Sequence, residues 1–106
     1  MELKELLESQ REFNINLKSD LTEDEIINNL TLALNVEVGE FANELAKFKY
    51  WKKHKEFSYE KTIMEFIDII LIWSSLAVYL GYEAEELEEK IKFKIQVNKD
   101  RQDNDN

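Results

Sequence analysis

The sequence predicts an all-α protein. Its 106 residues include no proline and only two glycines, whereas turns and sheets normally draw on both residue types. Apolar residues recur at helical spacing in four stretches, and residues that typically start or end helices separate these stretches. A chain of this length forms one hydrophobic core, so we expect residues 1–106 to be a single domain.

The first two helices are expected over residues 2–17 and 23–48. The first carries its leucines on one face and ends before the polar run 18–20. The second starts after Thr22, which Glu25 follows at the spacing of a capping box, where each side chain bonds the backbone N–H of the other residue. Its apolar stripe consists of Ile27, Leu30, Leu34, Phe41, Leu45 and Phe48.

The third and fourth helices are expected after Ser58 and near Glu83. Ser58 is a suitable N-cap, and Gly81 can supply the left-handed residue that ends the third helix. The fourth helix has an acidic first turn, which favours the helix dipole, and it is expected to end near Arg101 before a frayed tail over residues 102–106.

Four helices of this size predict an antiparallel bundle with short loops. The third helix is apolar nearly all round between Phe66 and Trp73, which is more surface than three neighbouring helices in a small monomer would cover. We therefore expect a four-helix antiparallel bundle that homo-oligomerisation completes.

Composition and charge exclude several classes of function. A net charge of −9 disfavours nucleic acid and anionic membranes as partners, because both are polyanions. The lack of cysteine excludes disulfides and thiolate metal sites, and the single histidine, His54, excludes two-histidine metal sites. The most apolar stretch, 66–80, is expected to be too short to span a bilayer, and the N-terminus lacks a signal-peptide core, so we expect a cytoplasmic protein without a membrane span.

Four carboxylates interrupt the apolar faces of the two central helices. Glu37 occupies a position of the apolar stripe, and Glu40 lies one turn further along the same side. Glu65 and Asp68 repeat this spacing on the next helix, where Asp68 is the one acid in a run of eight residues. Salt bridges to lysines or an exposed groove would explain any single pair, and for a single pair that is the more common explanation.

Two such pairs on successive helices favour a bound cation. Burying carboxylates together without a positive partner costs several kcal/mol, and few basic residues occupy matching positions on these helices. Oxygen ligands without nitrogen or sulfur suit Mg²⁺, or Mn²⁺ as a substitute.

These pairs also resemble a known family. Glu37-Val38-Gly39-Glu40, followed after twenty-four residues by Glu65-Phe66-Ile67-Asp68, is similar to the ExxE and ExxD pairs of the all-α nucleoside triphosphate pyrophosphatases, the superfamily of MazG and the dimeric dUTPases. The surrounding segments 32–44 and 48–52 resemble the dimeric, phage-type dUTPase branch. So do Gln10 with Asn14 and, near the C-terminus, Lys94, Asn98, Arg101 and Gln102. The resemblance covers nearly the whole chain.

This resemblance implies Mg²⁺-dependent hydrolysis of dUTP to dUMP and pyrophosphate by a homodimer or homotetramer. The implied metal ligands are Glu37, Glu40, Glu65 and Asp68, one of which also acts as the base. The implied substrate-binding residues are Gln10 and Asn14 at the uracil, Trp51 against the base or sugar, and Lys52, Lys94, Asn98 and Arg101 at the triphosphate.

Two alternatives stay open at this point. Many dimeric dUTPases carry His-Phe where this chain has Leu71-Ile72, and many are longer, so a MazG-like pyrophosphatase that acts on another nucleotide is the first alternative. A non-catalytic helical module that binds nucleotides or proteins is the second. Residues such as Lys52 and Trp51 also have plainer interpretations, as compensation of a helix dipole and as a tryptophan at a subunit interface.

Overall fold

The computed structural model describes residues 1–17, 19–45, 51 and 58–104. They form four helices: α1 (Leu3–Asn16), α2 (Glu23–Leu45), α3 (Tyr59–Tyr79) and α4 (Ala84–Asn104). No strand occurs in these described residues, and the all-α prediction is confirmed.

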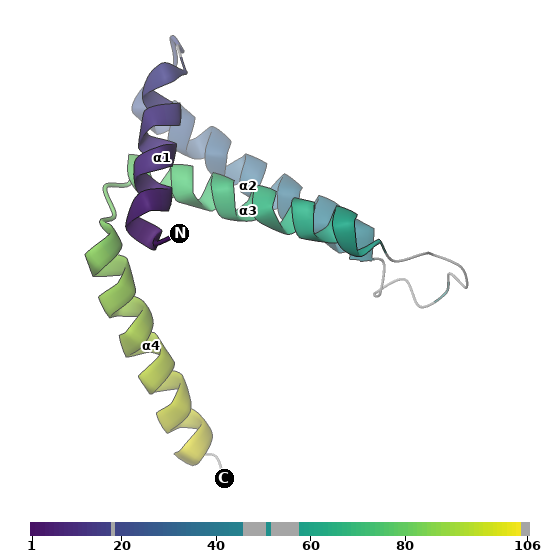
Figure 1. The fold of residues 1–106 in the computed structure, drawn as a ribbon, viewed down its shortest axis with the longest axis vertical. Coiled ribbons are helices and arrows are strands. Elements are labelled where there is room, and N and C mark those ends of the chain that lie inside the picture. Colours follow the sequence, from purple (N-terminus) through teal and green to yellow (C-terminus); the bar gives the residue numbers. More distant parts are fainter. Residues whose placement is uncertain (18, 46–50, 52–57, 105–106) are drawn as a thin grey trace.

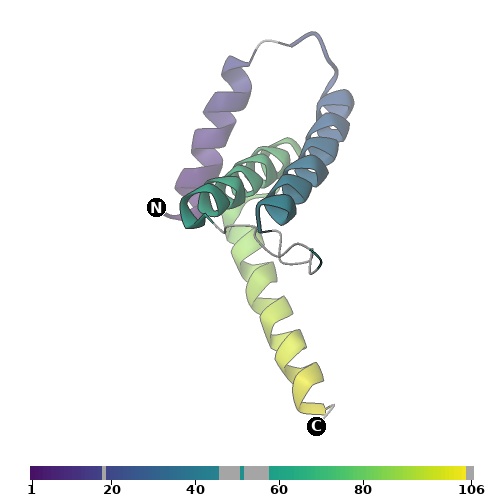
Figure 2. The same cartoon turned by 90° about the vertical axis from the view of Figure 1, so that its right-hand side faces the viewer.

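Helix α3 lies at the centre of the fold. It runs antiparallel to α2 along most of its length, and α1 crosses its C-terminal half (Figure 1). Figure 2 shows α1 and α2 on either side of α3. The C-terminal half of α3 is therefore flanked by both α1 and α2.

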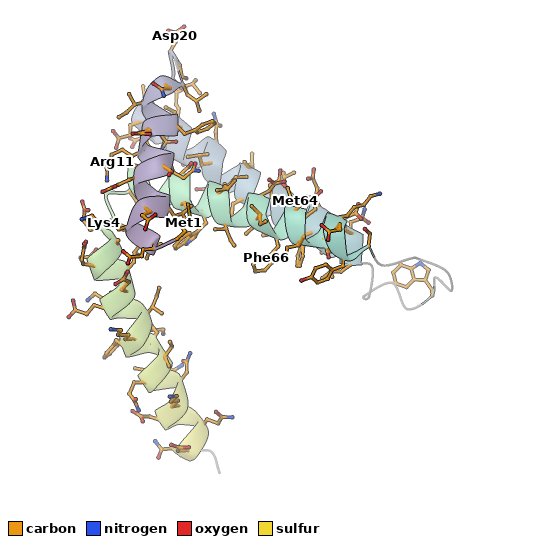
Figure 3. All side chains as sticks on the ribbon, viewed as in Figure 1. Met1, Lys4, Arg11, Asp20, Met64 and Phe66 are labelled. Atoms are coloured by element: carbon orange, nitrogen blue, oxygen red, sulfur yellow. The ribbon has the colours of Figure 1, made fainter. Side chains whose placement is uncertain are left out.

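Helix α4 does not pack beside the other three. Among the helices, only the backbone of α1 lies close to that of α4, and α4 extends away from the rest of the chain (Figure 1). Beyond its first turns its side chains project into open space on all sides (Figure 3). The expected four-helix bundle is thus not closed within one chain, because only the N-terminal end of α4, at Ala84 and Leu87, packs against the core.

Local signals place the starts of α2 and α3 as expected, whereas the end of α4 differs. Glu25 N donates to Thr22 Oγ1 and Thr22 N donates to Glu25 Oε1, both at 3.2 Å, which confirms the capping box of α2. Ser58 Oγ accepts from Lys61 N at 3.4 Å at the start of α3. Helix α4 ends at Asn104 rather than near Arg101, so residues 102–104 are helical.

Gly81 ends α3 in a left-handed conformation, with φ of 78°. Tyr82 N donates to the Ala77 carbonyl oxygen at 3.0 Å, and Gly81 N donates to that of Val78 at 3.1 Å. These two bonds define a Schellman motif, which lets the chain leave α3 and turn toward α4.

The hydrophobic core is small and lies where α1, α3 and α4 meet. Its buried apolar residues are Leu7, Ala77 and Ala84, with Leu3, Val78 and Leu87 packed against them. Along α2 and α3 packing is looser: Phe41 and Phe66 contact edge to face at 5.5 Å between ring centroids, yet Phe66 is 50% exposed. The labelled Met64 and Phe66 can be located on α3 in Figure 3.

Helix α3 is long and apolar enough to cross a membrane, so the expectation that its apolar stretch is too short to do so is wrong. A single such helix is weak evidence for a membrane protein, because the core helix of a soluble protein has the same length and composition. Glu65 and Asp68 lie within α3, where a hydrocarbon environment would make both charges costly.

Candidate functional site

A cleft of about 490 Å³ opens between α1, α2 and α3. This volume falls in the range of small-molecule binding sites. Helix α1 contributes Gln10 and Phe13, α2 contributes Leu30 and Glu37, and α3 contributes Asp68, Leu71, Ile72 and Ser75. The cleft therefore joins two of the predicted metal ligands to one of the predicted base-contacting residues.

Three of the four predicted acids converge between α2 and α3. Carboxylate oxygens of Glu37, Glu65 and Asp68 lie within 4.8 Å of one another. Glu65 and Asp68 share a face of α3 because they are three residues apart, and the antiparallel packing of α2 brings Glu37 opposite them. The sequence spacing and the helix pairing together create this acidic cluster.

Two oxygens of the cluster are buried without a partner. Glu37 Oε2 and Glu65 Oε2 are inaccessible to solvent, and neither accepts a hydrogen bond from any residue that the structure describes. Across residues 1–17, 19–45, 51 and 58–104, no lysine or arginine forms an ion pair with Glu37, Glu65 or Asp68. A buried carboxylate oxygen normally has a partner, so these two atoms indicate that a positive group belongs among them.

Burial and neighbouring charge also act on the titration of Glu37. Desolvation raises the pKa of Glu37 above its ordinary value of 4.5, and the negative charges of Glu40, Asp68 and Glu65 raise it further. Glu40 is exposed and lies outside the three-residue cluster, but its charge and its hydrogen bond reach Glu37. Glu40 thus borders the site from the next turn of α2.

The donor set fits a hard divalent cation. Glu37, Glu65 and Asp68 offer only carboxylate oxygens, which Mg²⁺ and Mn²⁺ prefer over softer metals. A cation held here would supply the partner that Glu37 Oε2 and Glu65 Oε2 lack. On the side of Glu37 and Asp68, the cleft of about 490 Å³ has room for a ligand that carries further oxygens.

The two residues expected at the base differ in their surroundings. Gln10 is half-buried and lines the cleft, where its Oε1 accepts a hydrogen bond from Ser75 Oγ at 2.7 Å. Asn14 is only 9% exposed, does not line this cleft, and donates from Nδ2 to the Ser75 carbonyl oxygen at 3.5 Å. The structure therefore brings Gln10, but not Asn14, to the cleft that holds the acids.

Of the remaining predicted substrate-binding residues, those that the structure describes do not line the cleft within one chain. Trp51 is 61% exposed and is not among the residues that line it. Lys94, Asn98 and Arg101 are exposed on α4, which packs against the other helices only through its N-terminal end, at Ala84 and Leu87. Lys52 lies outside the residues that the structure describes, as does the end of the second helix that was expected near Phe48.

Sequence reasoning did not single out Ser75. Its signal is the spacing of seven residues from Asp68, two helical turns along the same face of α3. A polar residue at that position, next to Leu71 and Ile72, marks the cleft face of an otherwise apolar helix.

The fold and the site agree with the class of all-α nucleotide hydrolases that the sequence resembles. Comparison with protein families is more specific, because a family model described as dUTPase matches residues 2–103. The chain therefore belongs to the dUTPase family, and at the level of the family it is a nucleotide diphosphatase-type hydrolase. No curated protein and no solved structure matches the chain.

Proposed function

We propose that this protein is a Mg²⁺-dependent dUTP diphosphatase, which hydrolyses dUTP to dUMP and pyrophosphate. The observation that carries the proposal is the acidic cluster: two of its buried oxygens lack partners, and it borders a cleft lined by an amide side chain. Membership of the dUTPase family supports uracil as the base.

The acidic cluster and a triphosphate require a cation between them, because both are strongly anionic. Glu37, Glu65 and Asp68 would hold it, with Glu40 at their border. When bound, Mg²⁺ supplies positive charge that attracts the triphosphate and makes a water molecule a better nucleophile at neutral pH.

The chain's own groups then carry out three tasks. Phe13, Leu71 and Ile72 give the cleft an apolar lining that packs against the nucleoside and excludes water. Gln10 hydrogen-bonds the base edge. One carboxylate of the acidic cluster accepts the proton of the attacking water, whose oxygen bonds to the α phosphorus while the bond from this phosphorus to the bridging oxygen breaks and pyrophosphate leaves.

Basic groups for the triphosphate come, in this proposal, from a second copy of the chain. Lys94 and Arg101 are the cations that the family resemblance assigns to the triphosphate, and α4 carries them away from its own cleft. A homodimer or homotetramer in which α4 reaches a neighbouring cleft would place them beside the substrate.

Pyrophosphate release from each common deoxynucleoside triphosphate in Mg²⁺ tests this function. We expect dUTP to be the best substrate and chelation by EDTA to abolish turnover. Glu37→Gln and Asp68→Asn should each lower kcat/KM by at least about a hundredfold while the helical circular-dichroism spectrum is unchanged. Glu88→Gln, at an exposed position of α4, is the matched control and should keep full activity. Retention of Mg²⁺-dependent turnover by both site variants would refute the proposal.

A further inference from the structure

Ser75 connects the cleft to the amide of Gln10. It is 6% exposed, and its hydroxyl donates to Gln10 Oε1 at 2.7 Å, which joins α3 to α1. The described part of the chain contains no other hydrogen bond of this hydroxyl. The preceding residue, Ser74, behaves differently, because its hydroxyl donates to the Ile70 carbonyl oxygen within α3 at 2.7 Å.

This bond determines which end of the Gln10 amide faces the cleft. A carboxamide has an acceptor end, Oε1, and a donor end, Nε2. With Oε1 bonded to Ser75, Nε2 is left to a ligand in the cleft. Rotation of the amide by half a turn would break the 2.7 Å bond that the Ser75 hydroxyl donates. The hydroxyl would then have to accept from Nε2 and turn its hydrogen to a carbonyl oxygen of its own helix, as Ser74 does.

Asn14, one turn further along α1 than Gln10, also hydrogen-bonds Ser75. Its Nδ2 donates to the Ser75 carbonyl oxygen, and the side chain is buried outside the cleft. Gln10 and Asn14 are thus both bonded to Ser75, through its side chain and its backbone respectively. This pairing prevents α1 and α3 from sliding past each other where Gln10 enters the cleft.

We propose that Ser75 determines base specificity as a positioning residue, by orienting Gln10 so that Nε2 donates into the cleft and selects a pyrimidine that has a carbonyl oxygen, rather than an amino group, at position 4. The inference rests on the proposed function, since it assumes that a pyrimidine nucleotide occupies the cleft. In this arrangement Asn14 supports Ser75 instead of contacting the base.

Uracil and cytosine differ at the group that such a donor reads. Uracil presents the O4 oxygen, an acceptor, where cytosine presents an amino group, a donor. A cytosine amino group opposite Gln10 Nε2 would set two donors against each other in a partly apolar cleft, which a hydrogen-bonding site rejects strongly. Thymine presents the same edge as uracil, so the Ser75–Gln10 pair discriminates against cytosine but not against thymine.

The test uses two measurements. Isothermal titration calorimetry with Mg²⁺ gives the dissociation constants of nonhydrolysable α,β-imido analogues of dUTP, dCTP and dTTP. Steady-state kinetics give kcat/KM for the three natural nucleotides. The wild-type protein should prefer the dUTP analogue over the dCTP analogue by about tenfold or more. Ser75→Ala frees the amide to rotate, so this preference should fall by about tenfold, mainly in KM, while the preference for dUTP over dTTP is unchanged.

Ser74→Ala is the matched control, because it removes a neighbouring hydroxyl whose bond stays within α3. It should change neither preference. Gln10→Met removes both ends of the amide and should lose the same preference as Ser75→Ala, and the double variant should lose no more, because both changes act through one contact. If Ser75→Ala fails to fold, as judged by circular dichroism, Ser75→Cys carries the test, because a thiol of similar size is a much weaker hydrogen-bond donor to Gln10 Oε1.

The outcomes separate this inference from the proposed function. A wild-type protein that binds the dUTP analogue preferentially but releases no pyrophosphate refutes the function and leaves the inference standing. Hydrolysis of dUTP with an unchanged dUTP-to-dCTP preference in Ser75→Ala overturns the inference alone, whatever the effect of Gln10→Met. Equal changes of both preferences, or a wild-type protein that does not discriminate against cytosine, also overturn it.

Discussion

Glu37 is the residue of the acidic cluster whose ionisation its surroundings oppose. Burial and three neighbouring carboxylates raise its pKa, so the folded chain holds the proton of this group more tightly than the unfolded chain does. As the pH rises from the ordinary value of 4.5 through the raised pKa, the folded state binds more protons than the unfolded state, and its stability falls. Above that pH range Glu37 is ionised in the folded protein, and the loss of stability is complete unless a cation neutralises the carboxylate.

Replacement of Glu37 by glutamine should therefore stabilise the metal-free protein. In EDTA at pH 7, Glu37→Gln is expected to melt at a higher temperature than wild type, and the difference should shrink as the pH falls to about 4, where the carboxylate is protonated. Millimolar Mg²⁺ should raise the melting temperature of wild type more than that of the variant, because the ligand stabilises the state that binds it. Thermal melts at fixed protein concentration measure both effects, and a lower melting temperature for the variant in EDTA at pH 7 would contradict them.

Individual residues of the site differ in how far the sequence could predict them. Glu65 and Asp68 share a face by spacing alone, so their proximity followed from helix geometry. Glu37 needed one further assumption, that α2 packs against α3, and its interruption of an apolar stripe supported it. Ser75 could not be assigned a role in advance, because its partner Gln10 lies 65 residues away on another helix.

At the level of the helices, local chemistry determined the ends and tertiary packing determined the directions. The Thr22–Glu25 capping box, the Ser58 cap and Gly81 act within a few residues, so the sequence predicted all three. The path of α4 depends instead on how the chain leaves the Schellman motif at Gly81 and on the few apolar contacts that Leu87 makes. No local pattern specifies that path, so the sequence predicted four helices but not the direction in which α4 leaves the other three.

The two glycines should respond to alanine in opposite directions. Gly81 has a positive φ, and a Cβ there meets no atom within 4 Å, so Gly81→Ala should lower the free energy of unfolding by about 1–2 kcal/mol through backbone strain alone. Gly39 is helical within α2 and also has open space at its Cβ position. Gly39→Ala should raise the free energy of unfolding by about 0.5–1 kcal/mol, because alanine restricts the unfolded chain and favours helix.

Urea unfolding followed by circular dichroism measures both changes. Each variant serves as the control of the other, since both add one methyl group to a site without close neighbours. Equal shifts for the two variants would contradict the assignment of the Gly81 effect to its left-handed conformation.

The whole chain exposes more surface than a compact monomer of its size. Its radius of gyration is 17.4 Å, whereas about 13 Å is expected for a compact domain of this length. It exposes 8669 Å², against about 6200 Å² for a typical folded monomer of the same mass. The excess is sufficient for the interface of an obligate homodimer. Only 22% of the most apolar window of α3 is buried within one chain, which indicates where a second copy would pack.

If α4 completes the cleft of a neighbouring copy, two inactive variants should restore activity when they are mixed, which a monomer could not do. Glu37→Gln disables the acidic cluster of its own chain, and an Arg101→Ala, Lys94→Ala double variant disables α4, so each protein alone should be inactive. In a dimer, a mixed pair contains one cleft with intact acids and an intact α4 from the partner. Equal mixing of the two proteins after reversible unfolding should restore about a quarter of wild-type activity, because half of the dimers are mixed and each of these has one working site.

The alternative, in which α4 serves the cleft of its own chain, gives no intact site in any mixed pair and hence no recovery. Sedimentation analysis of the wild-type protein supplies the control. The mixing experiment requires an assembly larger than the 12.7 kDa of one chain. Recovery in the mixture, with none in either protein refolded alone, would assign the basic face of α4 to the partner's substrate. If a stable mixed assembly shows no recovery, Lys94 and Arg101 serve the cleft of their own chain. Helix α4 would then have to fold back toward α2 and α3 to bring them to that cleft.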